Sequence, residues 1–156
     1  MTAIVESIEI ARRPDEVFAY ATNFAHYPAW QASVVSVRAE ENGPLHVGSR
    51  AEITRKVGPR QVAGTEELTA LQPPRSWEVC AVSDTVSGTA KGVIEPLAGG
   101  ERSRLTISLD FEGHGLGRLL VPLVVRRQAR KQLSRNQQKL KEMLERQTFA
   151  QTSLSD

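Results

Sequence analysis

A change in hydrophobic period near residue 113 is the feature that most constrains what this chain can fold into. Between residues 35 and 112, apolar and polar residues alternate in six short stretches. Alternation of this kind is typical of strands in a sheet with one covered face. Short turns such as Gly58-Pro59 and Ala98-Gly99-Gly100 separate the stretches, which favours an antiparallel meander. From Leu116 to about Arg146 the apolar residues recur at helical spacing, so one long helix is expected to cover the sheet.

A further strand and two short helices are expected before the meander. Ile4 to Ile10 alternates, with its isoleucines on one face. Pro14 suits the first position of a helix, and the acidic residues that follow it favour the positive end of the helix dipole. Asn23 is expected to end this helix and to cap a second one over Phe24 to Trp30. The chain therefore predicts an α+β fold in which a curved antiparallel sheet of seven strands wraps around a long C-terminal helix.

The boundaries of the later elements follow from the turn residues between them. Pro122 lies too deep in the last helical stretch for a first turn, so a kink there, or a helix that begins near it, is expected. A single domain is predicted over residues 1–146, with a flexible tail over 147–156. The predicted strands of the meander are Val35–Val37, Ser49–Val57, Gln61–Leu71, Ser76–Ser83, Val86–Pro96 and Ser103–Glu112. In the first of these, Val35 and Val37 are expected on one face.

Length and cysteine content fit one domain of a reducing compartment. A chain of 156 residues can bury a core without disulfides or metals. Cys80 is the only cysteine, which is typical of the cytosol. Residues 1–9 lack the regions of a signal peptide, and the longest apolar run, Leu119–Val125, is shorter than the roughly 20 residues that span a membrane. A cytoplasmic location is therefore expected.

The motif search predicts neither a metal nor a cofactor. His26, His46 and His114 are scattered, and no cysteine or carboxylate accompanies them at the spacing of metal ligands. The sequence contains no Gly-x-Ser-x-Gly, no phosphate-binding loop and no dinucleotide fingerprint. A net charge of +2 does not by itself indicate nucleic acid as a partner.

Several segments together resemble those of a known superfamily. They are Ser7-Ile8-Glu9-Ile10, Arg13-Pro14-Asp15-Glu16-Val17-Phe18, Asn23-Phe24-Ala25-His26-Tyr27-Pro28-Ala29-Trp30, Pro73-Pro74-Arg75 with Trp77, and Glu95-Pro96-Leu97. With these segments, the order of elements is similar to the helix-grip fold of the START-like (SRPBCC) superfamily, and especially to its polyketide cyclase/dehydrase and lipid-transport branch. This resemblance covers roughly residues 3–146 and implies the fold, while the members of the superfamily include enzymes, lipid carriers and sensors.

Small residues face large ones in the last predicted hairpin. If its turn centres on Gly99-Gly100, then Gly92 lies opposite Ile107, Ala90 opposite Leu109 and Gly88 opposite Phe111. Across the preceding turn, Trp77 is expected to lie opposite Gly92. One interpretation is close packing of a curved sheet, because glycines let a strand bend. The other is that these small residues leave room for a ligand between the sheet and the helix.

Two charged residues fall on the inward phase of the sheet. Arg55 follows Ala51 and Ile53 in alternation, and Glu66 is expected to have Ala51 and Ala81 as cross-strand neighbours. One interpretation places both charges at a solvated rim. The other is a polar contact that orients a ligand in an apolar pocket, with the two residues as mutual partners because buried charges need them. In that case Glu66 is also the one weak candidate for an acid or base.

The remaining candidates are apolar or aromatic. Tyr27 and Trp30 either cap the open end of the sheet or line an entrance, since each offers one hydrogen-bonding group on an apolar body. In the families that the chain resembles, this segment borders the mouth of the cavity. The residues predicted to bind a ligand are Tyr27, Trp30, Ile53, Arg55, Glu66, Trp77, Ala90, Gly92, Leu109, Phe111, Leu120 and Leu123.

The last helix is basic although the chain is nearly neutral. Nine arginines and lysines between Arg118 and Arg146 outnumber two acids, Glu142 and Glu145. This is either a solvated face or a surface for an anionic membrane or an acidic partner. Nucleic acid is not favoured, because no aromatic residues are interleaved.

Three functions follow from these patterns. The first, which we favour, is binding or transport of a hydrophobic small molecule such as a lipid, an isoprenoid or a polyketide-like compound. The second is an enzyme resembling polyketide cyclases, in which a cavity positions a flexible chain. The third is an interaction module that docks through the basic helix. The patterns set no oligomeric state.

Overall fold

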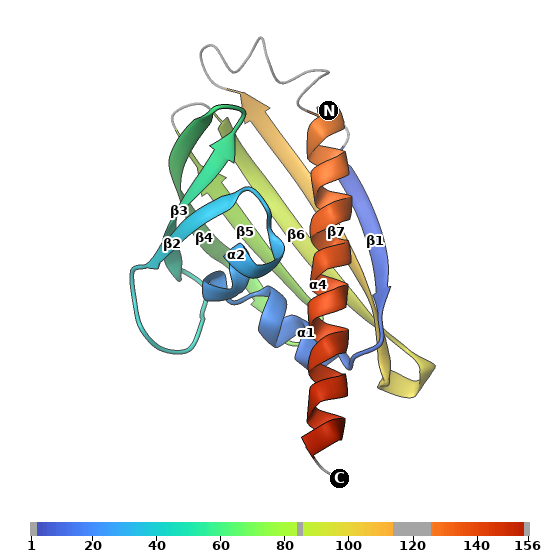
Figure 1. Cartoon of the computed structure of the whole chain (residues 1–156). Coiled ribbons are helices and arrows are strands. Elements are labelled where there is room, and N and C mark those ends of the chain that lie inside the picture. The colour runs from blue at the N-terminus through green and yellow to red at the C-terminus, as the bar shows by residue number, and fades with distance from the viewer. Residues whose placement is uncertain (1–2, 84–85, 114–125, 155–156) are drawn as a thin grey trace.

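The computed structural model describes residues 3–83, 86–113 and 126–154. A long helix lies across the concave side of a curved sheet in Figure 1, and the short helices pack against the same side. In chain order the elements are β1 (Ile4–Ile10), α1 (Pro14–Ala21), η1 (Phe24–His26), α2 (Tyr27–Trp30), β2 (Val34–Ala39), β3 (Arg50–Val57), β4 (Arg60–Gln72), β5 (Ser76–Val82), β6 (Val86–Leu97), η2 (Ala98–Gly100), β7 (Arg102–Gly113) and α4 (Arg126–Leu154).

All seven strands belong to one antiparallel sheet, in the order β1-β7-β6-β5-β4-β3-β2. The meander from β2 to β7 is continuous, and β1 adds to its far edge beside β7. This confirms the predicted α+β helix-grip fold, with two short helical segments after the first strand. Helix α4 continues to Leu154, past the boundary at residue 146 that the sequence suggested. The flexibility of the tail stays a prediction.

Local sequence explains where the first helices begin and end. Pro14 occupies the first position of α1, and the Glu16 side chain accepts a hydrogen bond from the Arg13 backbone N–H at 3.2 Å. Asn23 Oδ1 accepts from the Ala25 N–H at 3.0 Å, which confirms the predicted cap. These short helices carry the chain from β1 at one edge of the sheet to β2 at the other edge.

The predicted register of the last hairpin is confirmed at every position. Gly92 pairs with Ile107, Ala90 with Leu109, and Gly88 with Phe111. Trp77 pairs with Gly92 from the other side, as expected. A Cβ atom built on Gly92 would overlap the indole ring of Trp77, so the ring lies directly against the glycine backbone. Close packing therefore accounts for Gly92, because Trp77 fills the space that the missing side chain leaves.

The orientation predicted for Val35 in the second strand was wrong. Val35 was expected to share a face with Val37, yet Val35 is exposed and Val34 is buried. A register irregularity between Val34 and Ser36 shifts the alternation by one position. The bulge turns Val34 toward the core opposite Arg55.

One face of α4 completes the core. Leu133, Leu140 and Leu144 are buried and Ala129 is half-buried, which confirms the helical spacing predicted for this part of the chain. Between Leu133 and Leu140 the same face holds Gln137, whose buried side chain donates to the Glu6 carbonyl at 3.0 Å. The first part of the predicted helix, including the leucine stripe from Leu116 to Leu123 and the kink at Pro122, lies outside the described residues, and so does His114.

Polar contacts fasten α4 to the loop between β1 and α1. The Glu145 carboxylate accepts from the Ala11 N–H at 3.0 Å, and the Arg12 guanidinium donates to the Leu144 carbonyl at 3.0 Å. Arg12 also pairs with Glu16 at 2.8 Å. Burial raises the pKa of the Glu145 carboxyl, but the bonds from Ala11 and Lys141 outweigh it and hold that pKa below the ordinary value.

A methyl group at Gly92 is expected to destabilise the fold. The substitution Gly92→Ala should lower the free energy of unfolding by about 1–3 kcal/mol, because the indole of Trp77 must move out of its position. Urea denaturation measures the change. In a Trp77→Leu background the same substitution should cost clearly less, and an equal cost in both backgrounds would contradict the packing described.

The bond between Glu145 and Ala11 predicts a pH-dependent loss of stability. Because the folded pKa of Glu145 is lowered, its contribution is present above the unfolded value near 4.5 and is lost as the pH falls through the folded value. The variant Glu145→Gln should therefore be less stable than the native chain by about 1 kcal/mol at pH 7, a figure reduced for partial exposure. Denaturation curves between pH 7 and pH 3 should show the two proteins converging in acid. A constant difference across that range would refute this role.

Candidate functional site

The inner face of the sheet has a buried part and a half-buried part. Ile53, Trp77 and Val79 are buried beneath the helices, and Phe18 of α1 packs edge-on against Trp77 at 5.9 Å between ring centroids. Toward the other end, inward-facing small residues lose that cover. The half-buried residues, whose region we call the open end, are Gly64, Ala81, Gly88, Ala90 and Leu109.

A charge pair lies on the inner face where the two parts meet. Glu66 stands between Ala51 and Ala81, as the sequence predicted, and its side chain is 9% exposed. The guanidinium of Arg55 donates to Glu66 Oε2 from Nε at 3.2 Å and from Nη2 at 2.9 Å. Because Glu66 is buried and Arg55 is only 31% exposed, the pair is inward-facing and the alternative of a solvated rim is wrong for Glu66.

Two polar residues after α2 complete the surroundings of Arg55. Its Nη1 donates to Gln31 Oε1 at 2.9 Å and to Ser33 Oγ at 3.2 Å. Neither residue was predicted from the sequence. The pairing of Val34 with Arg55 brings this segment beside β3, but no pattern within residues 31–33 indicates it.

The carboxylate of Glu66 uses only one of its oxygens in these bonds. Both donors from Arg55 reach Oε2. Within the described residues, Oε1 has no hydrogen-bond donor. A carboxylate oxygen on a largely apolar inner face, next to alanines, can accept a bond from a hydroxyl or amide of a bound molecule.

Tyr27 adds a second polar group next to this pair. The residue is buried, and its burial raises the pKa of the phenol above its usual range. The charge of Glu66 raises that pKa further and the charge of Arg55 opposes it, so the phenol lies within the field of both. Tyr27 therefore keeps its proton at neutral pH and can donate a hydrogen bond.

Trp30 joins the same cluster through aromatic contacts. Tyr27 meets Phe24 and Trp30 edge-on, at centroid distances of 5.4 and 5.9 Å. Trp30 is 5% exposed, and its Nε1 is the buried side-chain polar atom that has no hydrogen-bond partner in the part of the chain that the structure describes. Since a buried N–H without a partner is costly, this atom also has capacity for an acceptor.

The cluster thus gathers four of the predicted residues: Tyr27, Trp30, Arg55 and Glu66. Ala90 and Leu109 lie on the same inner face at the open end. Ile53 and Trp77 are core residues, and Gly92 is covered by Trp77. Leu120, Leu123 and the side chain of Phe111 lie outside the described part of the structure. The arrangement can orient one polar group of an otherwise apolar molecule.

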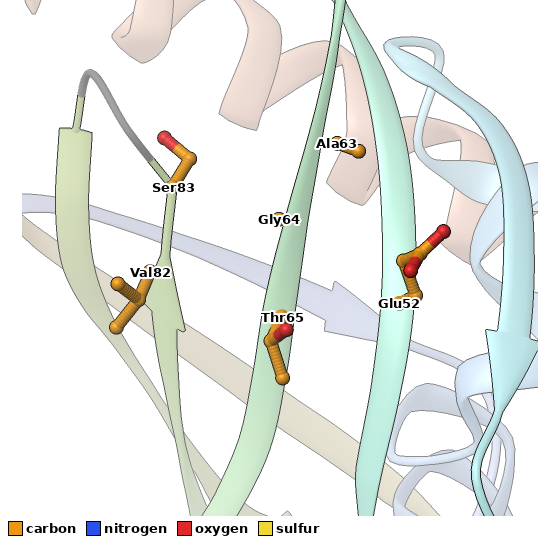
Figure 2. Close-up of a pocket in the computed structure, with 6 residues that line it drawn as sticks. All are labelled: Glu52, Ala63, Gly64, Thr65, Val82 and Ser83. Atoms are coloured by element: carbon orange, nitrogen blue, oxygen red, sulfur yellow. The ribbon is translucent and has the colours of Figure 1, made fainter.

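A hollow of about 260 Å³, lined in part by Gly64 of the open end, lies near the point where the pairing of β4 and β5 ends. Figure 2 shows the side chains around it. Gly64 permits the close approach of the two strands, since a Cβ there would lie 2.9 Å from the Val82 carbonyl oxygen. A second hollow of about 330 Å³ includes Cys80, Thr89 and Asp110 together with Ala81 and Gly88 of the open end. Neither includes Arg55 or Glu66, so neither is the predicted site.

Two features are absent from the described residues. No group of three histidine, cysteine or acidic side chains gathers at a distance that could hold a metal ion. No helix in the described ranges combines the length and the apolar character that crossing a membrane requires.

Three solved structures share the fold at low identity. The Zhui aromatase/cyclase from Streptomyces sp. R1128 is 15% identical, with a TM-score of 0.76 over 94% of each chain. TTHA0849 from Thermus thermophilus is also 15% identical at a TM-score of 0.76, over 91% of this chain and 96% of that one. A START superfamily protein from Mycobacterium smegmatis is 16% identical at 0.75, over 94% and 99%. A comparison with curated proteins gave no significant match.

The family comparison agrees with the fold. The model of the family described as polyketide cyclase/dehydrase and lipid transport matches residues 1–145, which is nearly the whole chain. Together with the helix-grip architecture, this match shows that the chain belongs to the polyketide cyclase/dehydrase and lipid transport family.

Proposed function

We propose that this protein binds a hydrophobic small molecule that carries a polar group, between the open end of the sheet and α4. The observation that carries the proposal is the Arg55–Glu66 pair, which lies on an otherwise apolar inner face beside half-buried small residues. Family membership supports the same class of ligand. Lipids, isoprenoids and polyketide-like compounds all fit this description.

The energetics of the pair support a binding role. Taking two charges out of water costs more than an apolar pair of similar size, so such a pair is weak evidence for stability. Glu66 Oε1 can accept a hydrogen bond from a ligand, and the Tyr27 hydroxyl and the Trp30 N–H can each donate one. A few convergent polar groups within an apolar lining are typical of sites for small molecules.

Native mass spectrometry of the freshly purified protein, with organic extraction, tests the proposal directly. We expect a bound apolar compound, or binding of at least one member of a panel of oleic acid, farnesol and 1-naphthol. An empty protein that binds none of the panel would contradict the proposal.

The charge pair is expected to control affinity for the panel member that binds. The variant Glu66→Gln should weaken that affinity about ten-fold, since one charge-assisted hydrogen bond is lost. Isothermal titration calorimetry measures it, and circular dichroism verifies the fold. The matched control is Glu52→Gln, because Glu52 forms a similar pair with Arg38 on exposed side chains of β3 and β2, at 3.1 Å. Equal affinity in both variants would exclude the pair from the site.

A second candidate is an enzyme resembling polyketide cyclases. The observation that favours it is the protonated phenol of Tyr27 beside the carboxylate of Glu66, an acid and a base within one cluster. A cavity that holds a flexible chain in one reactive fold supplies much of the catalysis in such enzymes. Incubation with a synthetic poly-β-ketone distinguishes the two functions: cyclised product that Glu66→Gln abolishes supports the enzyme, and an unchanged substrate supports binding alone.

A further inference from the structure

The open end also has an outward surface, and several elements meet there. The β3–β4 turn follows Val57, and β5 ends at Val82, close to Gly64. The last residue of β7, Gly113, pairs with the first of β6, Val86. In Figure 1 these strand ends lie at the top of the sheet, and α4 also starts at the top.

Contacts between α4 and β1 place the start of the helix at this same end. Arg130 pairs with Glu6 at 3.9 Å, Lys141 donates to the Glu9 carbonyl at 2.7 Å, and Glu145 meets Ala11. Helix α4 therefore runs in the direction of β1. Because Ile4 of β1 pairs with Leu109 near the end of β7, the first turns of α4 lie at the open end.

This end carries four cations that have no acidic partner among the described residues. Lys56 and Arg60 flank the β3–β4 turn, and Arg127 and Lys131 follow each other by one turn on the exposed side of α4. None of the four lies within 4.0 Å of a carboxylate in the described parts of the chain. Among the described acids at this end, Glu6 is paired with Arg130 and Asp110 of β7 is exposed. The four cations outnumber these acids, so the described side chains give a local excess of positive charge.

Two exposed valines accompany the cations. Val57 and Val82 are each 60% exposed, and both stand at this end of the sheet. Apolar side chains among cations are what an anionic bilayer surface can accommodate, because headgroups attract the cations while the interface takes up the valines.

We infer that this surface docks on an anionic membrane, with the open end of the sheet facing the bilayer. We call it the docking surface; its residues are Lys56, Val57, Arg60, Val82, Arg127 and Lys131. If docking serves to pass a hydrophobic ligand between bilayer and protein, that role rests on the proposed function. The docking itself is independent of it, because it is measured without a ligand. Nucleic acid fits less well, because its phosphates contact the cations but leave the exposed valines unused; an acidic protein is distinguished by the test below.

Vesicle co-sedimentation tests the docking. The full chain should bind vesicles of phosphatidylcholine with 30% phosphatidylserine at about 20 mM salt, and lose that binding at about 0.5 M, where charges are screened. Pure phosphatidylcholine should not bind it. Equal binding to both vesicles would overturn the inference. Absence of binding to anionic vesicles, with retention on polyglutamate or DNA, would overturn it in favour of another acidic partner.

A matched pair of variants locates the surface. Arg127→Glu with Lys131→Glu should weaken binding to the anionic vesicles about 25-fold or more, counting about five-fold for each cation lost. The control is Arg135→Glu with Lys139→Glu, which makes the same change on exposed residues about 12 Å farther along the helix. An equal loss in both would assign the binding to the whole helix and overturn the assignment to the open end.

A tryptophan at the turn provides an independent reading. In Val57→Trp, anionic vesicles should shift the emission to shorter wavelength, because the new indole enters the interface. The native Trp30 and Trp77 are buried and give a constant background. No shift despite co-sedimentation would overturn the orientation. Affinity of Arg127→Glu with Lys131→Glu for the small-molecule panel should be unchanged, so failed docking and failed ligand binding give different results.

Discussion

The fold depends on covering one apolar sheet face with helices, of which α4 is the longest. Leu105 and Ile107 on the sheet and Leu133, Leu140 and Leu144 on α4 belong to the same buried core. A sheet can wrap around a helix only if it curves, and close approaches at small residues permit this. Trp77 lying on Gly92 is the clearest instance. The contacts of Glu145 and Arg12 then fix the end of the helix to the loop after β1.

The covered face is not uniform, and its charge pair marks the division. Beneath α1 and α2 the inner residues are buried, while near Ala81 and Gly88 they are half-buried. Glu66 lies between these parts and holds Arg55, which reaches back to Gln31 and Ser33. The pair thereby connects the sheet with the segment that follows α2, and it supplies the polar groups of the inner face.

Periodicity predicted the fold and much of the register, because alternation and a turn of known position fix which residues face each other. Thus Glu66 was correctly placed between Ala51 and Ala81, and Trp77 opposite Gly92. Side-chain rotamers and β-bulges leave no comparable periodic pattern in the sequence. The bulge at Val34 reversed the face of Val35, and Gln31 and Ser33 reach Arg55 from an irregular segment. Register also could not tell whether the space at Gly92 was empty or filled.

The position of the pair has a further consequence for a bound molecule. Arg55 remains partly exposed, so water still weakens the field between it and Glu66. A molecule that displaced this water would strengthen every interaction in the cluster, including that with the Tyr27 phenol. The cost of desolvating Glu66 has already been met in folding, because its side chain is buried in the free protein. Binding therefore adds mainly the cost of covering Arg55, and a hydrogen bond to Glu66 Oε1 or from Trp30 Nε1 offsets it.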